Sequence, residues 1–172
     1  IADPVAFEWA ADGGLYVVEM RDYPLGMDGD GAPGSRIKLL RDDDGDGKYD
    51  RSTIFHEGMA FAMGLFPWRK GLLVTCAPDI LYLEDTNGDD VADVREVLYT
   101  GFGEGNQQHR VNGLRWGLDN WIYGANGDSS GEISSTKSAE SLNLRGRDFR
   151  IRPDGGHLDG QSGSTQFGRA QD

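Results

Sequence analysis

Short apolar stretches alternate with glycine-rich polar turns along the chain, and the alternation repeats. One paired element occurs three times: a short apolar strand that ends in Trp, a polar turn, and a second apolar strand. The three copies are Phe7–Trp9 with Gly14–Val17, Phe66–Trp68 with Gly71–Val74, and Leu114–Trp116 with Asn120–Tyr123. Two apolar runs separated by a tight polar turn are typical of a β-hairpin.

A second element follows each of the first two hairpins. Ile37–Asp50 aligns without a gap on Ile80–Asp93, an offset of 43 residues (80 minus 37), and each copy reads as strand, Asp/Gly turn and strand. In the third unit Asp148–Arg152 is the expected third strand, and Pro153–Gly156 replaces the Asp-rich turn. Hairpin and second element together give four strands in about 43 residues, the arithmetic of a propeller blade.

The pattern therefore predicts an all-β fold, a partial β-propeller of about three four-stranded antiparallel blades. We expect a single partial propeller domain over 1–172, with blades at about 4–57, 63–100 and 111–160 and the start of a fourth at 165–172. Propellers close with four to eight blades, so the chain is expected to be part of a wheel of about six. The Ser/Gly/Lys/Glu-rich stretch 128–141 predicts a long surface loop. The alternative is a free-standing β-sandwich whose repeats are accidental.

Composition narrows the possible partners. The formal net charge is −12, which argues against binding to nucleic acid or to anionic membrane surfaces. No apolar run approaches the length of a membrane span, so no direct membrane insertion by this segment is expected. The single cysteine, Cys76, ends the apolar run Leu72–Cys76 and is expected to be a small buried core residue.

Most of the acidic excess lies in the two Asp-rich turns. Alternate carboxylates on a tight turn can converge on one Ca²⁺ ion, which takes six to eight oxygen ligands. The spacing predicts calcium ligands at Asp42, Asp44, Asp46 and Asp50, with Gly47 at the bend, and at Asp85, Asn87, Asp89 and Asp93, with Asp90 in the glycine position. In a blade both turns join the third and fourth strands at the rim, so such an ion is expected to be structural. The alternative is a polar turn without an ion, since Asp, Asn and Gly are also common turn residues.

A glycine-rich crossing between the second and third units, Gly101–Arg110, would lie on the opposite face of the blades. It ends in His109 and Arg110, just before an inner strand. A histidine there can accept a proton near neutral pH, which makes His109 the candidate catalytic residue. Gln108, Arg110 and Asn112 are candidates to face substrate or cofactor. The alternatives are a histidine that only bonds the loop backbone, and Arg110 and Asn112 as structural partners.

The run His109–Tyr123 resembles the His-x-x-Gly segment of soluble quinoprotein glucose/sorbosone dehydrogenases. A closer resemblance is to the N-terminal propeller of PVC-type membrane-bound dehydrogenase proteins, carried by Thr100–Gly103, Gln107–Leu114, Gly146–Gly155 and the Asp-Gly-Asp-Gly turn. These resemblances imply pyrroloquinoline quinone (PQQ) as cofactor and His109 as the base. They also imply an extracytoplasmic (periplasmic) location, a haem c domain, and membrane association through other segments. This chain departs from the sugar dehydrogenase pattern at Asn112–Gly113, which shifts the glycine by one position, and at Leu118, which replaces a Pro.

The sequence therefore leaves two alternative functions. The first is part of a PQQ-dependent dehydrogenase acting on a sugar or other alcohol, inactive as this segment alone. The second is a non-catalytic propeller, stabilised by calcium, that binds carbohydrate or protein.

Overall fold

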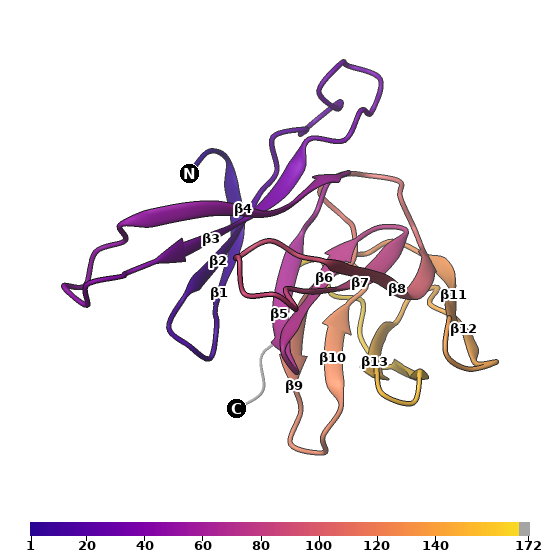
Figure 1. Ribbon diagram of the computed structural model, residues 1–172. Coiled ribbons are helices and arrows are strands. Elements are labelled where there is room, and N and C mark those ends of the chain that lie inside the picture. Colours follow the sequence, from indigo (N-terminus) through magenta and orange to yellow (C-terminus); the bar gives the residue numbers. More distant parts are fainter. Residues whose placement is uncertain (169–172) are drawn as a thin grey trace. The chain divides into compact units, whose positions relative to one another are not determined.

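The computed structural model describes residues 1–168 and is all-β, with fourteen strands in three antiparallel sheets (Figure 1). The strands are β1 Pro4–Trp9, β2 Leu15–Glu19, β3 Ser35–Arg41, β4 Arg51–Met59, β5 Gly64–Trp68, β6 Gly71–Cys76, β7 Asp79–Glu84, β8 Val94–Phe102, β9 Asn112–Trp116, β10 Ile122–Ala125, β11 Gly131–Ser135, β12 Ser141–Asn143, β13 Asp148–Arg152 and β14 His157–Gln161. Within residues 1–168 no helix is long and apolar enough to cross a membrane.

The first sheet has the order β1-β2-β3-β4, so each strand pairs with the next one in sequence. Side chains alternate between its two faces because the side-chain period of a strand is two. Ile37, Leu39 and Phe55 are at most 1% exposed on one face, and Phe55 meets Tyr16 edge-on at 5.0 Å. The sheet confirms the four-stranded unit predicted near 4–57.

The second sheet has the order β12-β11-β8-β7-β6-β5. Strands β5 to β8 are the unit predicted at 63–100, and Cys76 is a free, buried residue of β6, as expected. The prediction of a surface loop at 128–141 is wrong. Gly131 pairs with Phe102 and Ser134 with Thr100, so β11 adds to the open edge of β8 and β12 follows it.

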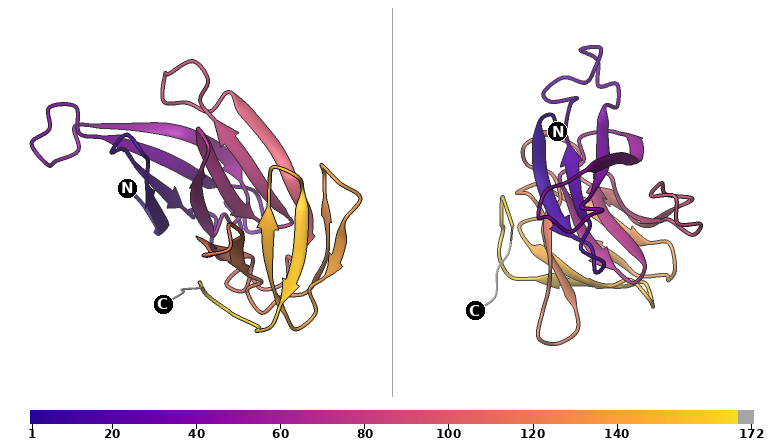
Figure 2. Two further views of the ribbon diagram at one scale, coloured as in Figure 1. Left: turned by 90° about the horizontal axis from the view of Figure 1, so that it is seen from below. Right: turned by 60° about the vertical axis from the view of Figure 1, so that its left-hand side comes forward.

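The serine-rich composition of this segment concealed two strands. The outer edge of β8 offers unpaired backbone groups that any extended segment can satisfy. Ile133 and Leu144, both 0% exposed, provide the apolar contacts that hold the hairpin there. In Figure 2 the orange hairpin β11–β12 lies beside β14, which it also contacts.

The third sheet has the order β14-β13-β10-β9 and corresponds to the unit predicted at 111–160. Ile122 of β10 pairs with Ile151 of β13, and both are fully buried. The start of a fourth unit was predicted at 165–172. Residues 165–168 form no strand, and 169–172 lie outside the described residues.

The chain divides into two compact units. One consists of Ile1–Val74 with Tyr82–Arg95, and the other of Thr75–Leu81 with the residues from Glu96 onward. Both Asp-rich turns belong to the first unit and His109 belongs to the second, so each candidate site is built within one unit.

Candidate functional site

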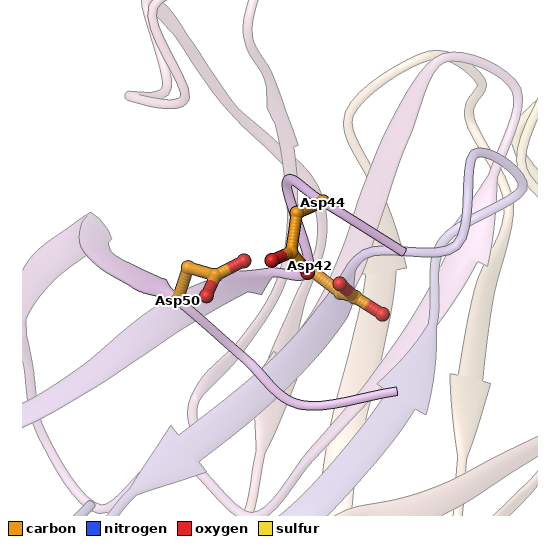
Figure 3. A group of neighbouring side chains, drawn as sticks. All are labelled: Asp42, Asp44 and Asp50. Carbon is orange, nitrogen blue, oxygen red and sulfur yellow. The ribbon is translucent and has the colours of Figure 1, made fainter. Parts of the chain in front are cut away.

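The first Asp-rich turn joins β3 to β4 and brings three carboxylates together. Ligand oxygens of Asp42, Asp44 and Asp50 all lie within 4.8 Å of one another, and Figure 3 shows Asp44 and Asp50 pointing toward each other across the turn. Oxygens bound at 2.3–2.6 Å to a common Ca²⁺ ion can be up to about 5 Å apart. The spacing of these three side chains therefore fits one calcium ion.

The fourth predicted ligand of this turn points elsewhere. Asp46 Oδ1 accepts a hydrogen bond from the Lys48 backbone N–H at 2.8 Å, and Oδ2 lies 3.0 Å from Lys48 Nζ. Asp42 accepts hydrogen bonds from the N–H groups of Gly45 and Gly47. These contacts also stabilise the turn without an ion, as the alternative interpretation of the sequence expects.

The second turn, between β7 and β8, satisfies its side chains internally. Asp93 accepts hydrogen bonds from the backbone N–H and hydroxyl of Thr86 and from Asn87 Nδ2, and these bonds hold the pKa of its carboxyl below the usual value. Asp85 accepts from the N–H groups of Gly88 and Asp90. Within residues 1–168, Asp42, Asp44 and Asp50 converge as a possible ion site, and the acids of this turn do not. Of the two turns, the first is therefore the better candidate for a calcium site.

Asp90 departs from the repeat and links the two turns. Its φ is 66°, in the same left-handed region as Gly47 at 86°. Its carboxylate pairs with Arg41 Nη2 at 2.7 Å and with Arg51 Nη1, from the two strands that flank the first turn. The hydrogen bond from Arg41 is the largest influence that lowers the pKa of Asp90. This ion-pair cluster was not predicted, and the Asp at a glycine position was its only signal in the sequence.

His109 lies in the segment between β8 and β9 and is partly exposed. Its ring Nε2 is 2.7 Å from Gln166 Nε2, and its backbone carbonyl accepts a hydrogen bond from Ser129 Oγ. The His109 backbone N–H donates to the Asn106 carbonyl at 2.9 Å. The imidazole is therefore reachable from solvent while its backbone is fixed.

The three residues predicted to accompany His109 have different surroundings. Arg110 is 5% exposed, and its Nη2 donates to the Glu104 carbonyl at 2.8 Å. Asn112 is also 5% exposed, and its side-chain amide bonds backbone groups of neighbouring segments. Gln108 is exposed beside the histidine. Arg110 and Asn112 thus support the backbone around His109, which was the alternative left open by the sequence.

Gln166 and Ser129 were missed because they come from segments far from His109 in the chain. No spacing rule relates positions 109, 129 and 166, and the contacts exist only in the folded unit. The other two histidines lie elsewhere. His157 Nδ1 is 2.9 Å from Glu140 Oε1, and burial lowers the pKa of His56.

Comparison with known proteins relates the chain to a described family. The model of a family described as a domain of unknown function, DUF7133, matches residues 1–172. The chain belongs to the DUF7133 family. No curated protein and no solved structure matches it.

In this DUF7133 chain the residues around His109 fit the proton transfer of a quinone-dependent oxidation better than the binding of the quinone itself. PQQ is a carboxylate-bearing quinone, and its binding calls for cations that face the ring. Arg110, the cation next to His109, is buried with its guanidinium on a backbone carbonyl. Arg110 is therefore not placed to clamp a quinone carboxylate beside His109, and the quinone is implied by the resemblance alone.

Proposed function

We propose that the chain forms about three blades of a β-propeller of about six blades. The support is a difference in exposure between equivalent aromatic residues of β1 and β5, the opening strands of the first two repeats. Phe66 and Trp68 of β5, a strand that lies next to β1, are each 6% exposed. Their counterparts in β1, Phe7 and Trp9, are 63% and 58% exposed. A further sheet packed against β1 would bury these two aromatic side chains as Phe66 and Trp68 are buried.

We also propose that this propeller belongs to an extracytoplasmic, periplasmic oxidoreductase that oxidises a sugar or another alcohol. His109 Nε2 takes the proton of the substrate hydroxyl as the carbon loses a hydride. PQQ, when bound, would supply the two-electron acceptor, and a haem c domain elsewhere in a longer chain would carry the electrons onward. The observation that carries this role is the contact between His109 Nε2 and Gln166 Nε2. An amide nitrogen can only donate, so His109 Nε2 is unprotonated in the neutral ring and can take a proton once the amide is displaced.

Dye-linked oxidation of sugars and alcohols by the full-length protein, with and without added quinone, tests this function. His109→Ala should lower the rate about 10²-fold or more, since general-base catalysis contributes about 10²–10⁴-fold. His157→Ala, which removes a histidine bonded to Glu140, is the matched control and should leave the rate unchanged. Absence of any quinone-dependent oxidation, or full activity of His109→Ala, would reject the proposal.

A second function is supported by the convergence of Asp42, Asp44 and Asp50. In this case the propeller is a non-catalytic binding module for carbohydrate or protein, with calcium as a structural ion. A calcium-dependent melting temperature in a protein that binds glycans, but oxidises no alcohol with quinone, would favour it over the oxidoreductase.

A further inference from the structure

The ring of His109 is paired with a side chain that cannot be an acceptor at the contacting atom. The Gln166 amide nitrogen carries only donor hydrogens, so at 2.7 Å it donates to His109 Nε2. A neutral imidazole that accepts at Nε2 carries its proton on Nδ1. The contact therefore selects the Nδ1–H tautomer, with the Nε2 lone pair accepting from the amide.

The backbone on both sides of Gln166 is anchored. Thr165 donates its N–H and its hydroxyl to the carboxylate of Asp148, a residue with 0% exposure. The side-chain amide of Asn112 donates to the Gln166 carbonyl and accepts from the N–H of Gly168, at 2.8 and 2.7 Å. Gln166 therefore extends from a fixed backbone toward His109.

The backbone of His109 is held from the other side by the segment after β10. Ser129 Oγ donates to the His109 carbonyl, and Gly127 N–H donates to the Thr165 carbonyl at 3.0 Å. A Cβ on Gly127 would lie 2.2 Å from the Arg110 carbonyl oxygen, so only glycine permits this close approach. The segment that contains Gly127 and Ser129 thus connects the segment carrying Gln166 to the loop carrying His109.

We propose that Gln166 is a positioning residue for His109: its amide occupies the Nε2 lone pair in the free protein, sets the Nδ1–H tautomer, and is displaced by the substrate hydroxyl. The inference rests on the proposed role of His109 as the base. After the ring has taken the proton, Nε2–H becomes a donor, and the Gln166 carbonyl can accept from it once the amide has rotated. A primary amide can therefore pair with the ring in both protonation states.

A carboxylate or an alkyl group at position 166 would behave differently. Glutamate would stabilise the protonated ring, since an opposite charge within hydrogen-bond distance favours the charged form. Leucine would offer no hydrogen bond, and the neutral ring would return to the Nε2–H tautomer that histidine ordinarily prefers. The two substitutions thus separate the effect of charge from the effect of the hydrogen bond.

The experiment is long-range proton–nitrogen NMR of the full-length protein labelled with ¹⁵N at histidine only, with His109 identified by the signals lost in His109→Ala. The neutral His109 ring should carry its proton on Nδ1. Gln166→Leu should move it to Nε2, and Gln166→Glu should give the ¹⁵N signals of a ring protonated on both nitrogens at neutral pH. Gln161→Leu is the control, because Gln161 bonds Asp159 and Gly160 and should leave the His109 signals unchanged.

A proton on Nε2 in the unsubstituted protein, or His109 signals identical in Gln166→Leu, would overturn the inference. The NMR readout needs no enzymatic activity. The expected tautomer without any quinone-dependent oxidation would reject the proposed function and leave the pairing intact. Oxidation that requires His109, with a pH profile unmoved by Gln166→Glu, would reject the positioning role and leave the function.

Discussion

Asp90 has a left-handed backbone conformation, which destabilises the fold, and forms ion pairs, which stabilise it. Substitutions can separate these two effects on stability. Its φ of 66° is left-handed, and its carboxylate, with the residue only 7% exposed, pairs with Arg41 at 2.7 Å. Asp90→Asn removes the charge and retains a side chain that tolerates this conformation. Asp90→Gly removes the pair and the strain together, while Asp90→Ala removes only the pair.

The expected cost of losing the pair lies between two limits. Removing one partner of a buried pair costs about 3–5 kcal/mol, and an exposed pair is worth about 0–1 kcal/mol. The Arg41 side chain is 22% exposed, so we expect Asp90→Asn to lower the free energy of unfolding by about 2 kcal/mol. Glycine avoids a left-handed penalty of about 1 kcal/mol, so Asp90→Gly should cost about 1 kcal/mol and Asp90→Ala at least about 2 kcal/mol.

Urea unfolding followed by circular dichroism and tryptophan fluorescence measures these differences. Asp89→Asn, at an exposed acid of the same turn, is the control and should stay within about 0.5 kcal/mol of the unsubstituted protein. A double-mutant cycle with Arg41→Met should give a coupling of about 1 kcal/mol. A larger loss of stability in Asp90→Gly than in Asp90→Ala would show that the left-handed backbone at position 90 is not strained. An unchanged free energy of unfolding in Asp90→Asn would show that the ion pair does not contribute to stability.

The pair also predicts a pH dependence. Arg41 and then Arg51 lower the folded-state pKa of Asp90 below its unfolded value, which is near 3.9. Its contribution is therefore fully present above that unfolded pKa and is lost as the pH falls through the lower, folded pKa. The stability gap between the unsubstituted protein and Asp90→Asn should be constant near pH 7 and close in acid. A gap of the same size at pH 2 would contradict this account.

Three further outcomes are expected. A chelator should lower the melting temperature of the unsubstituted protein. Asp44→Asn should abolish that shift, whereas Asp46→Asn should retain most of it. An equal shift in both variants would reject the three-carboxylate site. Lysine at Phe7 and Trp9 together should reduce self-association of the 172-residue chain in sedimentation experiments, and unchanged association would mean that another surface is responsible. Ile133→Ala should cost about 2–5 kcal/mol in urea unfolding because the side chain is fully buried, and a loss below about 0.5 kcal/mol would contradict β11 as a core strand.

Local patterns were enough to predict the strands of the three repeats, but not β11 and β12. Hairpins follow from alternation and turn chemistry, which act between residues close in the chain, and the 43-residue offset locates the repeated turns. Four-stranded units were predicted at about 4–57, 63–100 and 111–160, and these stretches hold β1 to β4, β5 to β8, and β9, β10, β13 and β14. The convergence of Asp42, Asp44 and Asp50 also follows from spacing, because one tight turn carries all three.

Tertiary structure decided what depends on distant segments. Polar residues 131–135 became a strand only because β8 offers an open edge, which no local propensity encodes. The ion pairs of Asp90 join positions 39 and 49 residues away, and the contact between His109 and Gln166 spans 57. By itself the sequence determined the repeated strands, the acidic turns and one candidate base. The folded chain decided which side chains those groups meet, because hydrogen bonds and ion pairs require proximity in space and not in sequence.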